Sequence, residues 1–166
     1  MMRFAFLNIC DMLINMNNSN KIYGPIYHGG KWNGISPIKM NRGSLGTGAY
    51  FTPDINRAKN YAEESSGKVI QAYLLLENPF LLEYNRDENI GSPLVHPCVK
   101  ALVQLGVPLN KAASKVEKVE EDKGYLGKEI STLAIKQGYD SLLFVVDGVV
   151  TEVVIWNSKQ VSMIVE

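Results

Sequence analysis

Apolar residues in this chain gather into short runs that alternate with polar positions or are continuously apolar. Period-two alternation and short apolar runs bounded by turn residues are typical of β-strands. The pattern predicts strands over residues 25–28, 49–52, 69–76, 80–84, 141–146, 151–156 and 160–165. The run 69–76 is almost wholly apolar, which predicts a strand buried on both faces. Asp147-Gly148 lies between two of these runs and is a hairpin signal.

Other stretches have helical spacing. Thr52-Pro53-Asp54 is a good helix start, with Thr52 as the capping side chain, and Ile55, Ala58 and Ala62 follow as the apolar positions of a helix that ends before Ser65. Helices are also expected over 94–105, with the helix proper starting near Pro97, and over 126–136, the second with Ile130, Leu133 and Ala134 facing inward. The charged segment 111–123 fits either a solvated helix or a mobile excursion. Together these elements predict an α+β domain with short strands and three or four peripheral helices.

Length and composition fit a soluble protein of one domain with a short extension. The chain has 166 residues, of which 46% are hydrophobic and 20% charged. We assign residues 1–20 to an N-terminal extension and 21–166 to the domain. The apolar part of the extension is shorter than the roughly 20 residues that span a bilayer, so no membrane partner is expected. The 17 basic and 17 acidic residues cancel, which leaves no overall field to attract nucleic acid or an anionic membrane.

The two cysteines predict neither a disulfide framework nor a metal site. Cys10 and Cys98 are far apart in the sequence and form no CxxC pair. His96 stands two residues from Cys98, but further ligands to complete a metal site are missing. We therefore expect a metal-free protein in the reducing cytoplasm. We also expect it to be a monomer.

Three polar residues stand on or beside short apolar strands. They are His28, Tyr50 and Glu152. By period two, Glu152 shares one strand face with Val154 and Trp156, and an unpaired carboxylate in such surroundings is costly. Each residue has an ordinary explanation by itself: a satisfied histidine, a core tyrosine, a surface glutamate. As a set they indicate a functional site.

A glycine-rich segment precedes Tyr50. The glycines of residues 43–48 superficially match a dinucleotide-binding fingerprint, but such a loop follows a strand and opens a helix. Here the glycines lead into a strand, which excludes a Rossmann domain. The long loop 31–47 carries Trp32, Lys39 and Arg42, and loops of this length in compact domains are usually functional or disordered.

Four short motifs, in order, carry a family resemblance. They are Tyr27-His28-Gly29, then Gly48-Ala49-Tyr50-Phe51, then Tyr61 eleven residues after Tyr50, and Glu152 at the head of an apolar strand. They resemble the ADP-ribosyltransferases of the His-Tyr-Glu class, the branch of diphtheria toxin and the poly(ADP-ribose) polymerases. Residues 138–161 are similar to the small transferase domains of phage polyvalent proteins. The likeness covers about 25–165, with nothing recognisable in 85–123. It implies two small packed mixed or antiparallel sheets with peripheral helices around an NAD-binding cleft.

The resemblance also implies a role for each matched residue. His28 would bond a ribose hydroxyl of NAD⁺, and the Gly29 backbone would bond the nicotinamide amide. Tyr50 and Tyr61 would stack on the nicotinamide ring. Glu152 would accept a hydrogen bond from the ribose 2′-hydroxyl and stabilise positive charge as the glycosidic bond breaks. Arg42 or Lys39 would reach the pyrophosphate from the long loop.

The chain departs from the family pattern at three positions. Gly30 replaces a small hydroxyl residue of the polymerases, and Ala58 replaces a serine that bonds the carboxamide, so fewer hydrogen bonds would hold nicotinamide. Val150 stands two residues before Glu152, so the Glu-x-Glu signature of arginine-modifying relatives is missing. His28 occupies the place of the arginine of the Arg-Ser-Glu class, which disfavours that class.

These features predict a mono-ADP-ribosyltransferase, an effector of phage or toxin type. It would use NAD⁺ without a metal and modify a macromolecule. A protein acceptor is favoured over nucleic acid, because nucleic-acid binding depends on neutralising phosphates and this chain has no net charge. Two alternatives stay open: an NAD⁺ glycohydrolase, and an inactive binding or inhibitory module on the same fold.

Overall fold

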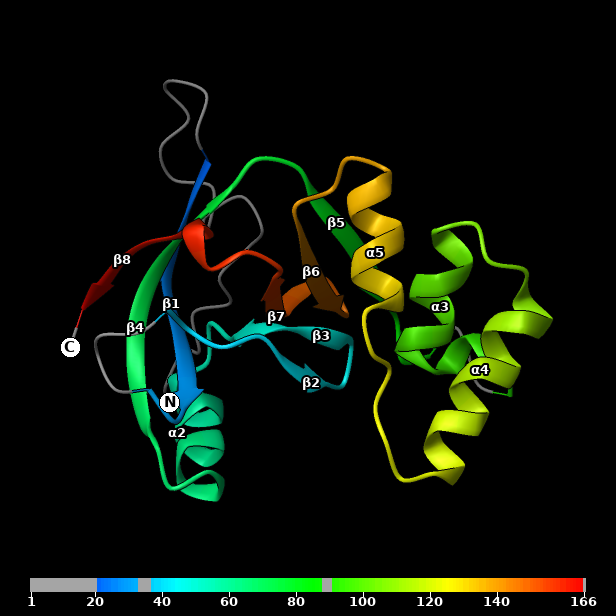
Figure 1. Cartoon of the computed structure of the whole chain (residues 1–166), viewed down its shortest axis with the longest axis horizontal. Helices are drawn as coiled ribbons and strands as arrows, with labels where there is room; N and C mark the ends of the chain where they lie inside the picture. The colour runs from blue at the N-terminus through cyan, green and yellow to red at the C-terminus, as the bar shows by residue number, and fades with distance from the viewer. Residues whose placement is uncertain (1–20, 33–36, 88–90, 166) are drawn as a thin grey trace.

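Two β-sheets form the centre of the molecule (Figure 1). The computed structural model describes residues 21–32, 37–87 and 91–165. The smaller sheet is antiparallel and has the strand order β1-β4-β8. These strands are β1 (Lys21–Gly30), β4 (Lys68–Leu76) and β8 (Val161–Val165). The predicted N-terminal extension, residues 1–20, lies outside the described residues.

The larger sheet has five strands in the order β2-β3-β7-β6-β5 and is mixed, because β5 runs parallel to β6. The strands are β2 (Asn41–Gly43), β3 (Gly46–Phe51), β5 (Pro79–Tyr84), β6 (Ser141–Val146) and β7 (Val149–Ile155). β6 and β7 form the hairpin predicted at Asp147-Gly148. The α+β class with two mixed or antiparallel sheets is thus confirmed.

Helices cover both sheets. They are α2 (Ile55–Glu64), α3 (Pro97–Gln104), α4 (Leu109–Glu121) and α5 (Glu129–Lys136), with single 3-10 turns η1 (Pro93–Val95) and η2 (Ser158–Gln160). α2 packs on β1 and β4, and α3 contacts α4, α5 and β5. In Figure 1, α3 and α4 lie at the opposite end of the molecule from the three-stranded sheet. Within the described residues, no helix is long and apolar enough to cross a membrane.

Two apolar clusters form the core, and β7 contributes to both. Residues such as Ile26 and Ile70 of the small sheet pack with Val153 of β7 between the sheets. Val154 faces the other way and packs with Leu102 and the neighbouring helices. The period-two alternation of β7 therefore sends successive valines to opposite cores.

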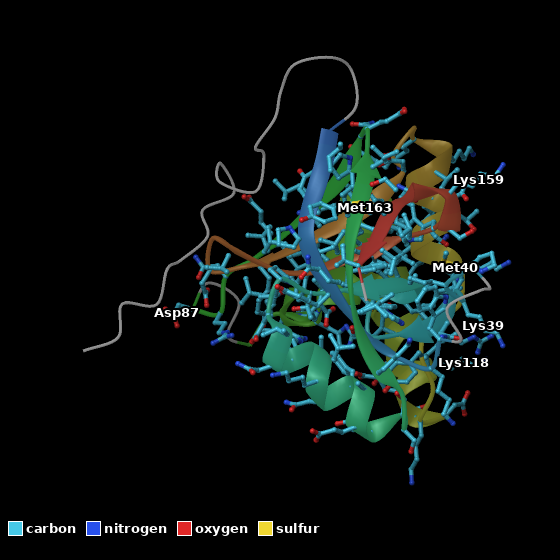
Figure 2. All side chains as sticks on the ribbon, turned by 90° about the vertical axis from the view of Figure 1, so that its left-hand side faces the viewer. Lys39, Met40, Asp87, Lys118, Lys159 and Met163 are labelled. Carbon is cyan, nitrogen blue, oxygen red and sulfur yellow. The ribbon has the colours of Figure 1, made fainter. Side chains whose placement is uncertain are left out.

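The prediction that β4 is buried on both faces is wrong. Its residues mostly alternate between buried and half-buried, because the described residues cover only one face of the small sheet fully. Figure 2 looks onto this sheet, where Met163 of β8 is labelled and is 52% exposed. The apolar run of β4 therefore corresponds to a strand with one buried face and one partly exposed face. It does not indicate a strand buried on both faces.

Two helix starts differ from the prediction. α2 is capped by Asp54 rather than Thr52: the Asp54 carboxylate accepts hydrogen bonds from the backbone N–H groups of Asn56 and Arg57. Ile55 is 40% exposed instead of buried, because it stands in the first turn, ahead of the face that packs on β1. α5 begins at Glu129, so the buried Leu126 belongs to the preceding connection.

The charged segment 111–123 is largely helical, within α4. Ala112 and Val116 are buried, while most other positions of α4 are exposed. Of the two alternatives for this segment, the solvated helix is confirmed. Because α4 packs against α3, the region without recognisable family motifs forms a helical layer of its own.

Candidate active site

Glu152 is a buried carboxylate at the centre of β7. Its side chain is 6% exposed. Oε1 accepts a hydrogen bond from Arg57 Nη2 at 2.6 Å, and Oε2 accepts a longer one from Ser44 Oγ at 3.4 Å. Burial raises the pKa of Glu152, while the Arg57 charge and the hydroxyls of Ser44 and Tyr61 act in the opposite direction. Among the described residues, the one strong partner of this carboxylate is the Arg57 guanidinium.

Arg57 was missed by the sequence reasoning. It lies on α2 four residues before Tyr61, so the two side chains share a helix face. Its guanidinium carbon is 5.9 Å from the Tyr61 ring centroid, and Nη2 is 3.5 Å from the Tyr61 hydroxyl. The spacing to Tyr61 and the need of Glu152 for a counter-charge were the available signals.

His28 links the two sheets and is held in one tautomer. Nδ1 is 2.7 Å from the backbone oxygen of Tyr50. Because a carbonyl oxygen only accepts, Nδ1 carries the proton. Burial lowers the pKa of His28, with the backbone hydrogen bond acting in the opposite direction. The ring is therefore neutral near pH 7, and its Nε2 lone pair can accept a hydrogen bond. Reciprocal backbone hydrogen bonds between Tyr27 and Thr52 fix β1 beside β3 at this point.

Tyr50 uses its hydroxyl inside the protein. The hydroxyl donates to Gly46 O at 2.6 Å and accepts from Leu45 N at 2.9 Å, which ties it to the turn between β2 and β3. Gly43 packs against the ring so closely that a Cβ there would lie 2.6 Å from it. With the hydroxyl engaged, the ring is what Tyr50 offers to a ligand.

Gly29 is required by helix packing. A Cβ at this position would overlap the backbone oxygen of Ala58 on α2. Ala58 itself is fully buried, so the same contact explains why a small residue stands there. The departure from the polymerase pattern at Ala58 is therefore accommodated by close contact between α2 and β1.

A cleft of about 840 Å³ brings the predicted residues together. Its lining includes all six predicted site residues: His28, Gly29, Arg42, Tyr50, Tyr61 and Glu152. Lys39, the second candidate for the pyrophosphate, lines it too. Ser44 and Tyr125, which sequence reasoning did not select, complete the wall near Glu152. The predicted juxtaposition is present, and the role of each residue stays a prediction.

One border of the cleft is basic. A space of about 550 Å³ adjoins it and shares Lys31 and Lys39 with its lining. Lys68 and Trp32 lie on the same wall, with Lys68 Nζ 5.5 Å from the Trp32 ring centroid. Clustered ammonium groups suit anionic groups such as phosphates.

His96 and Cys98 have structural partners. His96 Nδ1 accepts a hydrogen bond from Cys98 N at the start of α3, and Nε2 is 2.9 Å from a Glu120 oxygen. Cys98 Sγ donates to Ser44 O at 2.9 Å. A search of the described residues finds no group of three or more His, Cys, Asp or Glu side chains that could hold a metal ion.

A comparison with protein families gives one match over most of the chain. The family model described as ADP-Ribosyltransferase in polyvalent proteins matches residues 24–166. No curated protein and no solved structure matches the chain. The match confirms the resemblance drawn from the His28, Tyr50, Tyr61 and Glu152 motifs. In general, this family uses NAD⁺ as its substrate and carries out ADP-ribosyl transfer. The chain belongs to the ADP-ribosyltransferases of polyvalent proteins.

Proposed function

We propose that this protein cleaves NAD⁺ at the bond between nicotinamide and ribose and transfers one ADP-ribosyl group to a protein. The observation that carries the proposal is Glu152, whose carboxylate is 6% exposed and lines a cleft together with His28 and two tyrosines. A buried acid in a cleft beside groups that can form hydrogen bonds is typical of a catalytic residue.

The reaction balances without a further reagent. The bond from ribose C1′ to the nicotinamide nitrogen breaks, and its electron pair leaves with nicotinamide as a neutral molecule. C1′ acquires oxocarbenium character, and the fixed negative charge of Glu152 stabilises it in surroundings that exclude water. A nucleophilic side chain of the acceptor then bonds to C1′ and releases its proton to solvent.

The chain's own groups fit the parts of NAD⁺. Nε2 of His28 accepts a hydrogen bond from a ribose hydroxyl, as its tautomer requires. The rings of Tyr50 and Tyr61 hold the nicotinamide, at about 0.5–1.5 kcal/mol per aromatic contact beyond area burial. Lys39 and Arg42 bind the pyrophosphate as charge-assisted donors.

The two oxygens of Glu152 have different tasks in this scheme. Oε1 is engaged by Arg57 at 2.6 Å, whereas the contact of Oε2 to Ser44 is 3.4 Å. Oε2 is therefore the oxygen that takes the ribose 2′-hydroxyl. Arg57 acts as a positioning residue that keeps the buried carboxylate ionised.

The test measures nicotinamide release and ADP-ribosyl label on protein, for the wild type and for Glu152→Gln. The variant keeps size and hydrogen bonding but removes the charge, so both signals should fall about 10²–10³-fold, as when one preorganised group is lost. Glu64→Gln is the matched control, because Glu64 also lines the cleft but is exposed.

Other results would support the alternatives. Glu152-dependent nicotinamide release with free ADP-ribose and no labelled protein identifies a glycohydrolase. Absence of release from a folded wild-type protein identifies a binding module.

A further inference from the structure

A third space, smaller than the other two, opens beside the cleft. It has a volume of about 220 Å³ and lies between the turn that joins β2 to β3, strand β6 and helices α3 and α4. Its apolar wall consists mainly of Leu45, Val116, Val119, Leu126 and Phe144. The region that carries no family motif, α3 and α4, thus supplies much of this cavity.

The small cavity shares part of its wall with the cleft that contains Glu152. Ser44 and Tyr125 line both it and the cleft. Ser44 Oγ is also 3.4 Å from Glu152 Oε2. A group bound in the small cavity would therefore lie one residue away from Glu152, where an acceptor must approach C1′.

The chemistry of the wall selects the occupant. The volume is below the roughly 300–1,000 Å³ of pockets that enclose whole small-molecule ligands, so it suits a single side chain. Among the described residues that line it there is no Lys or Arg, and its one carboxylate, Glu120, contacts His96. His96 lines the cavity too, but its Nε2 is 2.9 Å from a Glu120 oxygen, so a phosphate would find no free counter-charge among these residues. An apolar side chain would replace water against apolar walls.

We propose that this cavity is an acceptor-recognition pocket that takes an apolar side chain, of the size of Leu, Met or Phe, next to the residue that is modified. The inference rests on the proposed function and names its substrate class: a protein segment with an apolar residue close to the nucleophile. Filling an apolar pocket distinguishes substrates by about 10-fold or more for a whole side chain.

Val119 offers a way to fill the cavity without touching the cleft. It lies on α4, is half-buried and lines only the small cavity. Val119→Phe places a ring in the space meant for the acceptor. Gly124→Leu fills the same cavity from the loop after α4. The backbone tolerates this change, because a Cβ at Gly124 would lie 3.5 Å or more from Val119, an ordinary van der Waals distance.

Lys118→Phe is the matched control. Lys118 is the exposed neighbour of Val119 on α4 and is labelled at the edge of the molecule in Figure 2. The Lys118→Phe variant adds the same phenyl ring to α4, at a position outside the cavity. Thermal unfolding of all variants shows that each is folded.

The experiment uses the full chain, NAD⁺ and a peptide library with Lys, Arg, Ser, Asp, Glu or Cys at the centre and randomised flanking positions. Mass spectrometry identifies the peptides that gain ADP-ribose, and nicotinamide release is measured without peptide. We expect the wild type to favour Leu, Met or Phe within three positions of the modified residue by about 10-fold. Val119→Phe and Gly124→Leu should lose this preference while basal nicotinamide release is unchanged, and Lys118→Phe should keep it.

Several results would overturn the inference. Modified peptides without an apolar preference, or a preference that survives both filling variants, would remove the pocket from acceptor recognition. Nicotinamide release with no modified peptide, or with label on an added oligonucleotide instead, would exclude the apolar protein acceptor but leave NAD⁺ cleavage intact. Lack of release from folded wild type would instead contradict the proposed function itself.

Discussion

The two spaces that border the cleft have opposite chemistry. One is lined by Lys31, Lys39 and Lys68 with Trp32. The other is lined by apolar groups such as Val116 and by Glu120, without a described cation. NAD⁺ carries a diphosphate, and an apolar acceptor side chain carries no charge. We therefore propose that the space lined by lysines binds NAD⁺ and that the apolar cavity binds the acceptor. A net charge of zero for the whole chain conceals this separation.

Among the variants that test this comparison, the largest effect should come from the space lined by lysines. Lys31→Gln combined with Lys39→Gln removes two of the ammonium groups available to a diphosphate. We expect KM for NAD⁺ to rise about 30-fold, since a hydrogen bond to a charged group contributes about 1.5–3 kcal/mol and exposure reduces it. The peptide preference should not change. Steady-state kinetics at low salt measures KM for NAD⁺, and the peptide library measures the preference.

Lys159→Gln serves as the control for that variant, because Lys159 is an exposed lysine on η2 that lines neither space (Figure 2). If the control raised KM as much, overall charge rather than the space lined by lysines would bind NAD⁺.

The next effect concerns Arg57 of α2, which donates a hydrogen bond to Glu152. Its charge lowers the pKa of Glu152, so Arg57→Met should raise that pKa further. Cleavage needs the ionised carboxylate and is lost as pH falls through its pKa. The acid limb of the pH profile of kcat/KM should therefore move to higher pH in the variant. Arg86→Met, which removes an exposed arginine paired with Asp147, should leave the limb in place.

A smaller effect should come from enlarging the apolar cavity. Val119→Ala widens the cavity, so the preferred side chain next to the modified residue should shift from Leu toward Phe or Trp. The shift should be a few-fold, because one or two methyl groups discriminate weakly. The peptide library reads it directly, and an unchanged ranking would mean that Val119 does not contact the acceptor.

The smallest effect is on stability. Burial raises the pKa of Glu152 above its usual value, so the folded protein binds this proton more tightly than the unfolded chain. Stability from this group is then present below the unfolded pKa and decreases as pH rises through the folded pKa. Glu152→Gln removes the titrating carboxyl group and therefore removes this decrease in stability. The thermal stability of the variant relative to wild type should therefore be higher at pH 8 than at pH 4. An equal difference at the two pH values would contradict the pKa shift.

The strand-borne part of the site could be predicted because its signals are local. His28, Tyr50 and Glu152 stand in short motifs on strands, and β6 was predicted with its observed bounds, 141–146. Pairing of the strands then brings residues 124 positions apart, His28 and Glu152, to one cleft. The α+β class follows from the same alternation.

The rest could not be predicted because it depends on how separate elements pack. The Arg57–Glu152 ion pair joins residues 95 positions apart on a helix and a strand. The spacing of Arg57 to Tyr61 places Arg57 on the same helix face but does not identify Glu152 as its partner. Ser44 and Tyr125 lie in connections whose path is set by α3, α4 and β3. The apolar cavity arises only where those connections meet, so the sequence gives no motif for it.

NAD⁺ binding and turnover measured together on Glu152→Gln test the central claim most directly. If Glu152 acts on the charge that develops during cleavage, the variant should bind NAD⁺ within about 3-fold of wild type by calorimetry, while kcat for nicotinamide release falls about 10²–10³-fold. A loss of binding that accounts for the whole decrease, or turnover that persists without the carboxylate, would contradict the account.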